Sequence, residues 1–340
     1  ELERRPTTNF PQPPPDKGRD AKPERAMIDV RSIRPSLQRL AQSGVFLGTS
    51  SWKYPGWLGQ LYTTGAYEYR GRMSKSRFER HCLEEYAEIF PSVCVDASFY
   101  RFPGERYLED LAGQVPSGFR FSHKVTDTIT LKHFPRHERH GELAGRDNPC
   151  YLDADIFLQS FLSPLQSHRE KTGLIIFQFS HFYSSDYEYG RDFVDDLDAF
   201  LSKLPTDEWD FAVEIRNSSF LKKPYFETLA RHGVGHVYNQ WQRMPSLSRQ
   251  LQLNAPDRKA TPVGCRLLLK CGRPYKNAVE SFQPYDRIRE EQNEARMASA
   301  GLVRQLLENP RGRRSYLYVN NRLEGNALAT ISAILALLEG

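Results

Sequence analysis

The stretch Phe211-Ala212-Val213-Glu214-Ile215-Arg216-Asn217 reads as a short, largely apolar strand that contains two charged side chains. Strand side chains alternate between two faces, so Glu214 and Arg216 point the same way. A buried charge is costly unless it is paired. We therefore expect these two side chains to belong to a polar site inside a barrel of strands.

The rest of the chain repeats the same kind of strand at regular intervals. The other strand-like runs are Val45–Ser51, Val93–Phe99, Phe119–Val125, Leu174–Ser180, Val234–Gln240, Cys265–Cys271 and Ser315–Asn321. Most are separated by segments of helical period, namely Ser74–Phe90, Ala154–Ser167, Tyr189–Leu204, Pro224–His232, Pro284–Leu307 and Asn326–Leu338. Strands that alternate with helices indicate parallel βαβ units, which build a doubly wound sheet or a closed barrel. Eight such units predict a single α/β domain over residues 45–340, a TIM-type (β/α)8 barrel.

Residues 1–44 differ in composition from this domain. Pro11-Gln12-Pro13-Pro14-Pro15 stands among charged residues of both signs. Such a segment buries too little apolar surface to offset its ordering entropy. We expect a mostly irregular N-terminal arm with a short helix near residues 32–42; a proline-rich ligand for a partner domain is the alternative.

Composition narrows the function classes. The formal net charge of +5 favours anionic partners slightly, but it falls short of the concentrated basic face of a nucleic-acid-binding domain. The five cysteines lack a CxxC spacing, which argues against a zinc ribbon or a disulfide framework. No apolar run approaches the ~18 residues of a membrane span, and the N-terminal residues lack the apolar region of a secretion signal, so we expect no such signal. We expect a cytoplasmic protein without a membrane partner, and the oligomeric state stays open.

Polar residues recur where the predicted strands run into the loops that follow them, which is where barrel enzymes carry their reactive groups. We expect Glu214, Asp96 and Lys124 to be catalytic, with Glu214 as the base. The expected substrate-binding residues are Arg216, Asn217, Tyr100, Arg101, Gln178, Lys270, Asn320, Asn321, Trp52 and Tyr238. His236, on strand six with Tyr238, shares this predicted inward face. The long segments Leu131–Tyr151 and Gln242–Pro262 follow strands three and six and could cover the same end of the barrel.

Charge balance on this face points to an anionic ligand. Asp96 and Glu214 are negative, whereas Lys124, Arg216 and Lys270 are positive. Arginine suits a carboxylate or phosphate through its fork of donors. The alternative is a salt-bridge network that only fixes the register of the barrel.

Several of these stretches resemble the motifs of the domain-of-unknown-function-72 family, from about residue 46 to the end of the chain. They are Gly48-Thr49-Ser50-Ser51-Trp52-Lys53-Tyr54-Pro55-Gly56-Trp57, Asp96-Ala97-Ser98-Phe99-Tyr100-Arg101-Phe102-Pro103, Phe119-Arg120-Phe121-Ser122-His123-Lys124, Phe177-Gln178-Phe179, Glu214-Ile215-Arg216-Asn217-Ser218-Ser219-Phe220 and Tyr318-Val319-Asn320-Asn321 with Gly325-Asn326-Ala327. The resemblance implies a TIM-type barrel and no assigned activity. Asn217 stands where the family usually has His, Phe220 where it has Trp, Asp96-Ala97 in place of Glu-x-Asn, and Lys270 near a usual Arg.

The residues support one leading hypothesis and several rivals. We expect an enzyme, a hydrolase or lyase without metal or cofactor, that acts on a small anionic, phosphorylated or sugar-containing substrate. A metal held by Asp96, Glu214 and His236 lacks a strict ligand motif, and a Schiff base on Lys124 conflicts with the nearby carboxylates. The main alternative is a nucleic-acid-binding barrel without catalysis, using loop 131–146 with Phe134 and the aromatic residues Trp52, Tyr54 and Trp57. A ligand-binding barrel without turnover is the third.

Overall fold

Eight parallel strands close into a barrel in the spatial order β1-β10-β9-β8-β7-β6-β5-β4, which confirms the predicted fold. The computed structural model describes residues 29–340, so most of the predicted arm lies outside the described residues. The barrel strands are β1 (Val45–Thr49), β4 (Ser92–Val95), β5 (Arg120–Lys124), β6 (Thr172–Gln178), β7 (Phe211–Glu214), β8 (Gly235–Gln240), β9 (Val263–Leu267) and β10 (Ser315–Val319). A small hairpin, β2 (Glu68–Tyr69) and β3 (Arg72–Met73), lies outside the barrel sheet.

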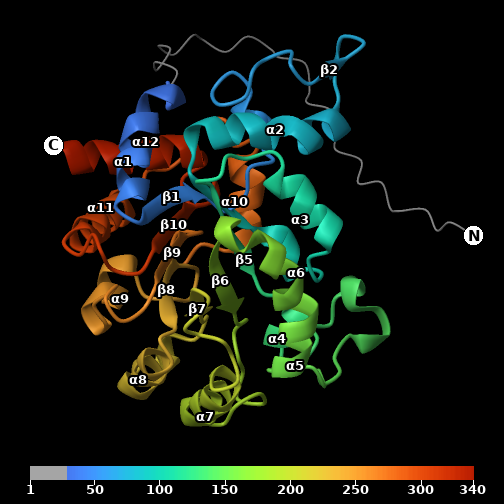
Figure 1. Cartoon of the computed structure of the whole chain (residues 1–340), viewed down its shortest axis with the longest axis vertical. Helices are drawn as coiled ribbons and strands as arrows, with labels where there is room; N and C mark the ends of the chain where they lie inside the picture. Colours follow the sequence, from blue (N-terminus) through green and yellow to red (C-terminus); the bar gives the residue numbers. More distant parts are fainter. Residues whose placement is uncertain (1–28) are drawn as a thin grey trace, which may run out of the picture.

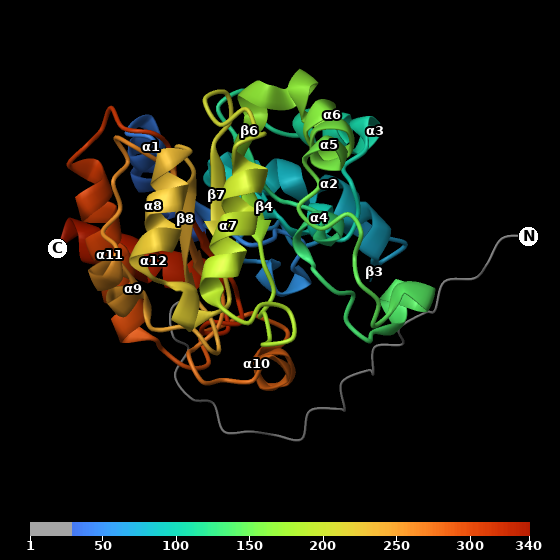
Figure 2. The ribbon, with the colours of Figure 1, turned by 90° about the horizontal axis from the view of Figure 1, so that it is seen from below.

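Helices surround the strands (Figure 1). They are α1 (Arg34–Gln42), α2 (Lys75–Ile89), α3 (Glu105–Ala112), α4 (Asp127–Thr130), α5 (Ala154–Ile156), α6 (Ser163–Leu165), α7 (Gly190–Leu201), α8 (Lys223–Arg231), α9 (Leu247–Leu253), α10 (Tyr275–Phe282), α11 (Asn293–Leu307) and α12 (Ala327–Glu339). The 3₁₀ turns are η1 (Val30–Ile33), η2 (Pro55–Trp57), η3 (Asp96–Phe99), η4 (Glu138–Leu143), η6 (Gln166–Lys171) and η7 (Ser218–Phe220), and η5 (Phe157–Leu162) is π-helical. In the turned view α10 lies beyond one end of the strands (Figure 2). Among the described helices, none has the length and apolar character needed to cross a membrane.

The outer faces of the strands form the main core with these helices. Phe177 and Phe211 point outward and pack on Phe157, and Phe177 also packs on Phe200, with ring centroids 5.1 to 5.9 Å apart. All four side chains are at most 2% exposed. Edge-to-face contacts of this kind stabilise a core beyond the area that they bury, so the barrel is supported from outside and its interior is free to hold polar groups.

The short helix expected near residues 32–42 is α1, preceded by η1. Its N-terminal turn contains Pro35, which the first turn of a helix tolerates. Val30 and Leu37 are fully buried against the barrel core. This part of the predicted arm therefore packs as one more covering helix.

The helix predicted over Pro284–Leu307 is wrong in its first nine residues, because α11 begins only at Asn293. Tyr285 has a φ of 71°, which an α-helix does not allow. The backbone N–H groups of Arg289 and Glu290 donate to the carbonyl oxygen of Glu324 instead of to a preceding turn. The segment is thus held by a contact with the loop after β10, which local periodicity does not report.

A side chain from α2 closes the barrel between β1 and β4. The two strands share a single paired position in the sheet, Thr49 with Val93. The hydroxyl oxygen of Tyr86 accepts from the backbone N–H of Thr49 at 3.0 Å and donates to the carbonyl oxygen of Ser92 at 3.0 Å. Tyr86 is completely buried. One phenol therefore bridges a seam where the backbone ladder is short.

Tyr86→Phe should weaken this seam. It leaves the backbone groups of Thr49 and Ser92 without this partner, and a buried group that loses its partner costs about 1–3 kcal/mol. Urea unfolding should show that loss in the free energy of unfolding. Tyr69→Phe, at a tyrosine that is 61% exposed, is the matched control. Equal unfolding midpoints for the two variants would show that the Tyr86 hydroxyl does not stabilise the closure of the barrel.

Candidate active site at the barrel mouth

The barrel interior is apolar at one level and charged at the next. Inward-facing apolar side chains of Phe46, Cys94, Leu174, Ile176, Ala212 and Val237 form one buried cluster with two tyrosines, Tyr316 and Tyr318. Two residues after Cys94, Ile176 and Ala212 of this cluster come Asp96, Gln178 and Glu214. Parallel neighbours that pair in register face the same way, as Gln178 and Glu214 do. The polar residues are therefore gathered at the ends of the strands where the βα loops begin.

Glu214 lies at the centre of this charged level. Its carboxylate is completely buried between two guanidinium groups. Oε1 lies 2.5 Å from Nη2 of Arg216, and Oε2 accepts from Nη1 of Arg266 at 2.7 Å. Burial alone would raise the pKa of Glu214, but the two arginines hold the pKa of this carboxyl below its ordinary value. Glu214 is consequently an ionised anchor for both arginines.

Arg266 carries the network across the barrel. Its Nη1 donates to Oε1 of Gln178 at 2.9 Å, and its Nη2 lies 3.3 Å from Oδ1 of Asp96. The same Asp96 oxygen is 3.5 Å from Nζ of Lys124. The network thus joins residues of β5, β6, β7 and β9 with Asp96, which follows β4.

The members of the network differ in their access to solvent. The side chain of Asp96 is 32% exposed, whereas those of Lys124 and Arg216 are 8% exposed and that of Arg266 is 3% exposed. Burial lowers the pKa of Lys124, although Asp96 opposes the shift. Burial also lowers the pKa of Arg216 to about 10. Asp96 is therefore the carboxylate that a ligand at the mouth can reach.

Two cations of the network rest on aromatic rings. Nζ of Lys124 lies 4.1 Å from the ring centroid of Phe99, and the guanidinium carbon of Arg216 lies 4.2 Å from the ring of Trp241. Such contacts stabilise a cation where water is scarce. Nη1 of Arg216 is buried and has no hydrogen-bond partner among residues 29–340. That donor is therefore unsatisfied within the described protein.

Several predicted site residues lie outside this network. Asn217 uses its whole amide on the loop after β6, accepting from the N–H of Phe182 at 2.9 Å and donating to its carbonyl at 2.8 Å. Arg101 is exposed and lies 5.8 Å from the ring of Tyr107. Lys270 is half exposed and is 2.6 Å from Oε1 of Glu290. Asn217 thus fixes a loop, and Arg101 and Lys270 make contacts at the surface.

The predicted inward orientation of strand six is wrong. In β8, His236 pairs in register with Val213, which faces the helices. Nδ1 of His236 is 3.0 Å from the hydroxyl of Tyr225 on α8. Tyr238 donates to the carbonyl of Asn254 at 2.6 Å, also outside the barrel. Since His236 faces away, the metal set Asp96, Glu214 and His236 does not converge, and the described residues contain no other group of three suitable ligands.

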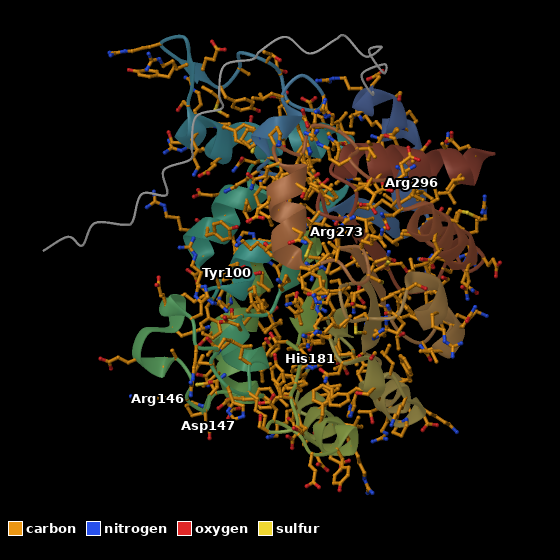
Figure 3. All side chains as sticks on the ribbon, turned by 180° about the vertical axis from the view of Figure 1, so that it is seen from behind. Tyr100, Arg146, Asp147, His181, Arg273 and Arg296 are labelled. Carbon is orange, nitrogen blue, oxygen red and sulfur yellow. The ribbon has the colours of Figure 1, made fainter. Side chains whose placement is uncertain are left out.

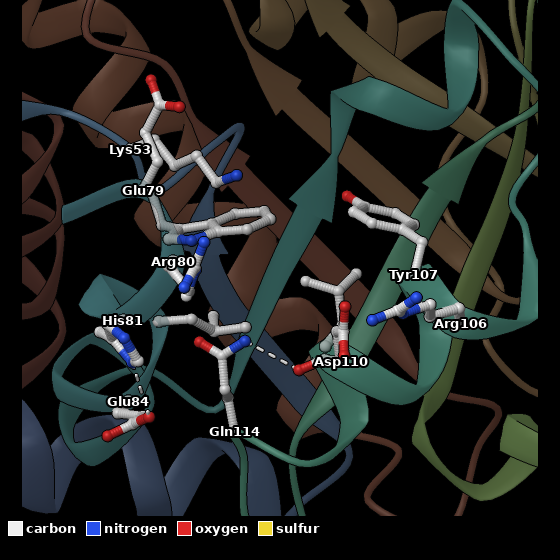
Figure 4. Close-up of a pocket in the computed structure, with 12 residues that line it drawn as sticks. Lys53, Glu79, Arg80, His81, Glu84, Arg106, Tyr107, Asp110 and Gln114 are labelled. Carbon is white, nitrogen blue, oxygen red and sulfur yellow. Dashed lines mark hydrogen bonds and ion pairs between the residues drawn. The ribbon is translucent and has the colours of Figure 1, made fainter. Parts of the chain in front are cut away.

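Trp52 also lies outside the mouth. It lines a groove of about 610 Å³ between α2 and α3, together with Lys53, Arg80 and Tyr107 (Figure 4). Its side chain is only 4% exposed, and Trp57 is fully buried. Phe134, in the long loop after β5, is 8% exposed. The aromatic residues named for nucleic-acid stacking are thus mostly covered by protein.

Asn320 and Asn321 follow β10 and are buried. Oδ1 of Asn320 accepts from the N–H of Arg322 at 3.0 Å, and Oδ1 of Asn321 accepts from the N–H of Ala327 at 2.7 Å. Within the described part of the chain, Nδ2 of Asn320 has no partner. Asn320 continues the inward face of Tyr318, so this second spare donor belongs to the mouth.

Tyr100 stands at the rim, 63% exposed. Figure 3 shows the molecule from behind, with Tyr100, His181 and Arg273 around the centre of the barrel. The guanidinium of Arg139 lies 5.1 Å from the Tyr100 ring and is paired with Asp127 at 2.7 Å. Arg139 belongs to the long loop after β5, and His133 of that loop lies 3.0 Å from Asp186 in the loop after β6. The loop Leu131–Tyr151 thus borders the mouth, whereas Gln242–Pro262 contains α9 on the outside of the barrel.

Sequence reasoning missed Arg266. A signal was present, because Arg266 is a charge in the apolar run Val263–Leu269 and has the same strand parity as Lys270. The strand ends at Leu267, so the inward position falls on Arg266 and Lys270 lies beyond the barrel.

Glu214→Gln should destabilise the protein strongly. It leaves Arg216 and Arg266 buried without their carboxylate, and breaking a buried pair costs about 3–5 kcal/mol. Chemical unfolding at pH 7 measures the loss. Glu227→Gln is the matched control, because Glu227 is exposed and pairs with Lys223 on α8 at 3.5 Å. A loss no larger than that of the control would mean that the Glu214 pairs do not support the fold.

The lowered pKa of Glu214 predicts that its contribution to the free energy of unfolding depends on pH. Because the folded-state pKa of Glu214 lies below its ordinary value of 4.5, the unfolded chain binds this proton first as the pH falls. The stabilisation from Glu214 is present above that value and is lost as the pH falls through the folded-state pKa. The difference in unfolding free energy between the native protein and Glu214→Gln should shrink below pH 4.5. A difference that stays constant down to the acid unfolding transition would contradict the depressed pKa.

Residues 46–340 match the model of the family described as "Protein of unknown function DUF72". A DUF72 family protein from Enterococcus faecalis V583 has a similar structure, with a TM-score of 0.57, 17% identity, and coverage of 87% of this chain and 96% of that chain. One from Thermotoga maritima MSB8 gives a TM-score of 0.54, 20% identity, and coverage of 87% and 99%. No curated protein matches the sequence. The match over most of its length shows that this chain belongs to the DUF72 family of proteins of unknown function.

Proposed function

We propose that the barrel mouth binds a small anionic substrate and that the protein is an acid–base enzyme, a hydrolase or a lyase. The observation that carries the proposal is an excess of cations beside spare donors. Arg216, Arg266 and Lys124 face only two carboxylates in the network, Glu214 and Asp96. A site that is positive and partly shielded from water favours a carboxylate or phosphate group.

Arg216 is the residue proposed to hold the anionic group. Glu214 occupies its Nη2, which leaves the buried Nη1 free to donate to a ligand oxygen. The ring of Trp241 fixes the plane of the guanidinium. Lys124 supplies a second positive charge 3.5 Å from Asp96. Arg266 and Gln178 act as positioning residues, because Arg266 contacts both Gln178 and Glu214, and Gln178 also contacts Arg216.

Asp96 is the residue proposed to move the proton. Its partial exposure distinguishes it from Glu214, whose two oxygens are both paired and inaccessible. Oδ1 of Asp96 contacts Lys124 and Arg266, and a carboxylate within reach of a ligand can serve as a general base. The role that sequence reasoning gave to Glu214 therefore passes to Asp96, and Glu214 orients the cations.

Inorganic phosphate is the first test of the proposed anion site. Titration calorimetry should detect phosphate binding to the native protein, and Arg216→Lys should weaken it at least about tenfold, since a lysine keeps the charge but loses the fork of donors. Arg231→Lys, an exposed arginine paired with Asp198 at 2.8 Å on the outside of the barrel, should bind phosphate as the native protein does. Native protein that fails to bind phosphate, or equal binding by Arg216→Lys, overturns the anion site.

Catalysis has a separate test. Phosphate esters and glycosides of nitrophenol make a suitable panel of chromogenic substrates. Any turnover found should fall by roughly 10²–10⁴ in Asp96→Asn, the range for losing a positioned acid–base group, while phosphate binding persists. Unchanged turnover in Asp96→Asn would refute its proposed role, and absence of turnover over the whole panel together with phosphate binding would favour a binding protein.

A further inference from the structure

A collar of aromatic side chains stands above the charged network. Among residues 29–340, five tyrosines are exposed, Tyr69, Tyr100, Tyr183, Tyr189 and Tyr275. Tyr100, Tyr183 and Tyr275 lie in segments that follow β4, β6 and β9, at the mouth. Exposed tyrosines of this kind offer large rigid contact areas at a low entropic cost, which is a property of binding surfaces.

Tyr100 and Tyr275 are held in place although they are exposed. The rings of Tyr100 and Phe99 meet edge to face, with their centroids 5.4 Å apart. The guanidinium of Arg139 lies over the Tyr100 ring. Tyr275 has Arg322 at 4.8 Å from its ring and Trp241 at 6.3 Å. Trp241 is the residue on which the Arg216 guanidinium rests, so one side of the collar is continuous with the anion site.

Short chains of contacts link both tyrosines to the charged network. Phe99, which packs on Tyr100, has Nζ of Lys124 at 4.1 Å from its ring, and that Nζ is 3.5 Å from Oδ1 of Asp96. On the other side, Trp241 contacts Tyr275 and carries the guanidinium of Arg216. Nε of Arg322, whose guanidinium lies over the Tyr275 ring, is buried and lacks a hydrogen-bond partner among the residues placed in the structure, so an unsatisfied donor stands beside Tyr275.

From this arrangement we propose that the substrate of the mouth combines a flat aromatic ring with its anionic group, as a nucleoside monophosphate does. The inference rests on the proposed anion site. The anionic group takes the free Nη1 of Arg216, and the ring stacks on Tyr100 or Tyr275, which are 63% and 47% exposed. The donor on Arg322 suits a ring nitrogen or carbonyl oxygen. Rings stack on tyrosine with little regard to sequence or substituents, so the collar selects a flat ring and leaves its identity open.

Four probes separate the contributions of ring and anion: inorganic phosphate, ribose 5-phosphate, adenosine and adenosine 5′-monophosphate. Calorimetry on the full chain should show the monophosphate binding at least about tenfold more tightly than ribose 5-phosphate, which matches one stacking contact. Tyr275→Ala and Tyr100→Ala should reduce that advantage and leave the affinity for inorganic phosphate unchanged. Tyr69→Ala, on the β2–β3 hairpin, is the control and should bind all four probes as the native protein does.

The outcomes distinguish this inference from the proposed function. If phosphate binds but the monophosphate has no advantage over ribose 5-phosphate, the aromatic collar has no part in recognition and this inference is wrong while the anion site stands. The inference is also overturned if the advantage survives in the Tyr100→Ala Tyr275→Ala double variant. If phosphate itself does not bind to the native protein, the anion site fails first. Thermal unfolding of each variant verifies that the loss does not come from misfolding, and tryptophan fluorescence offers a second readout, because a ring bound at Tyr275 would lie near Trp241.

Discussion

The barrel interior depends on one carboxylate held between two guanidinium groups. Glu214 is inaccessible to water, and its pairs with Arg216 and Arg266 make two buried guanidinium groups and an inward carboxylate tolerable in one layer. An isolated cation at any of these positions would carry a large desolvation penalty. The pairing also fixes the direction in which Arg216 presents its remaining donor. Fold and candidate site therefore share one electrostatic constraint, and neither can be altered without the other.

This division of labour separates two carboxylates that look alike in the sequence. Asp96 and Glu214 both follow apolar residues on strands of the same barrel. Glu214 is enclosed because it is the last residue of β7 and its side chain faces inward. Asp96, in contrast, begins the turn η3 immediately after β4 and reaches the rim. Position relative to the strand end decides which carboxylate orients cations and which one meets solvent.

The sequence was sufficient to predict the barrel, its eight strands and most members of the charged layer, because strand alternation is a local property. Residues whose direction depends on neighbours were less accessible. His236 and Tyr238 alternate as expected, but the register of β8 against β7 turns them toward α8 and α9. Arg266 was passed over for Lys270 because the end of β9 cannot be located from an apolar run. The start of α11 was misplaced for a similar reason, since Glu324, from a distant loop, captures the backbone before it.

Because of the Tyr86 bridge, the barrel does not resist strand separation equally at all of its strand pairs. Elsewhere each strand is tied to its neighbours by backbone ladders of two to five paired positions, while the β1–β4 seam has one pair and a phenol supplied by α2. A ladder can fray one bond at a time, but the phenol leaves only when α2 leaves. Opening of the cylinder is thereby coupled to detachment of a surface helix. The first hydrogen-exchange signal of barrel opening should appear in α2 and at Thr49 together, ahead of the strands that carry the charged layer.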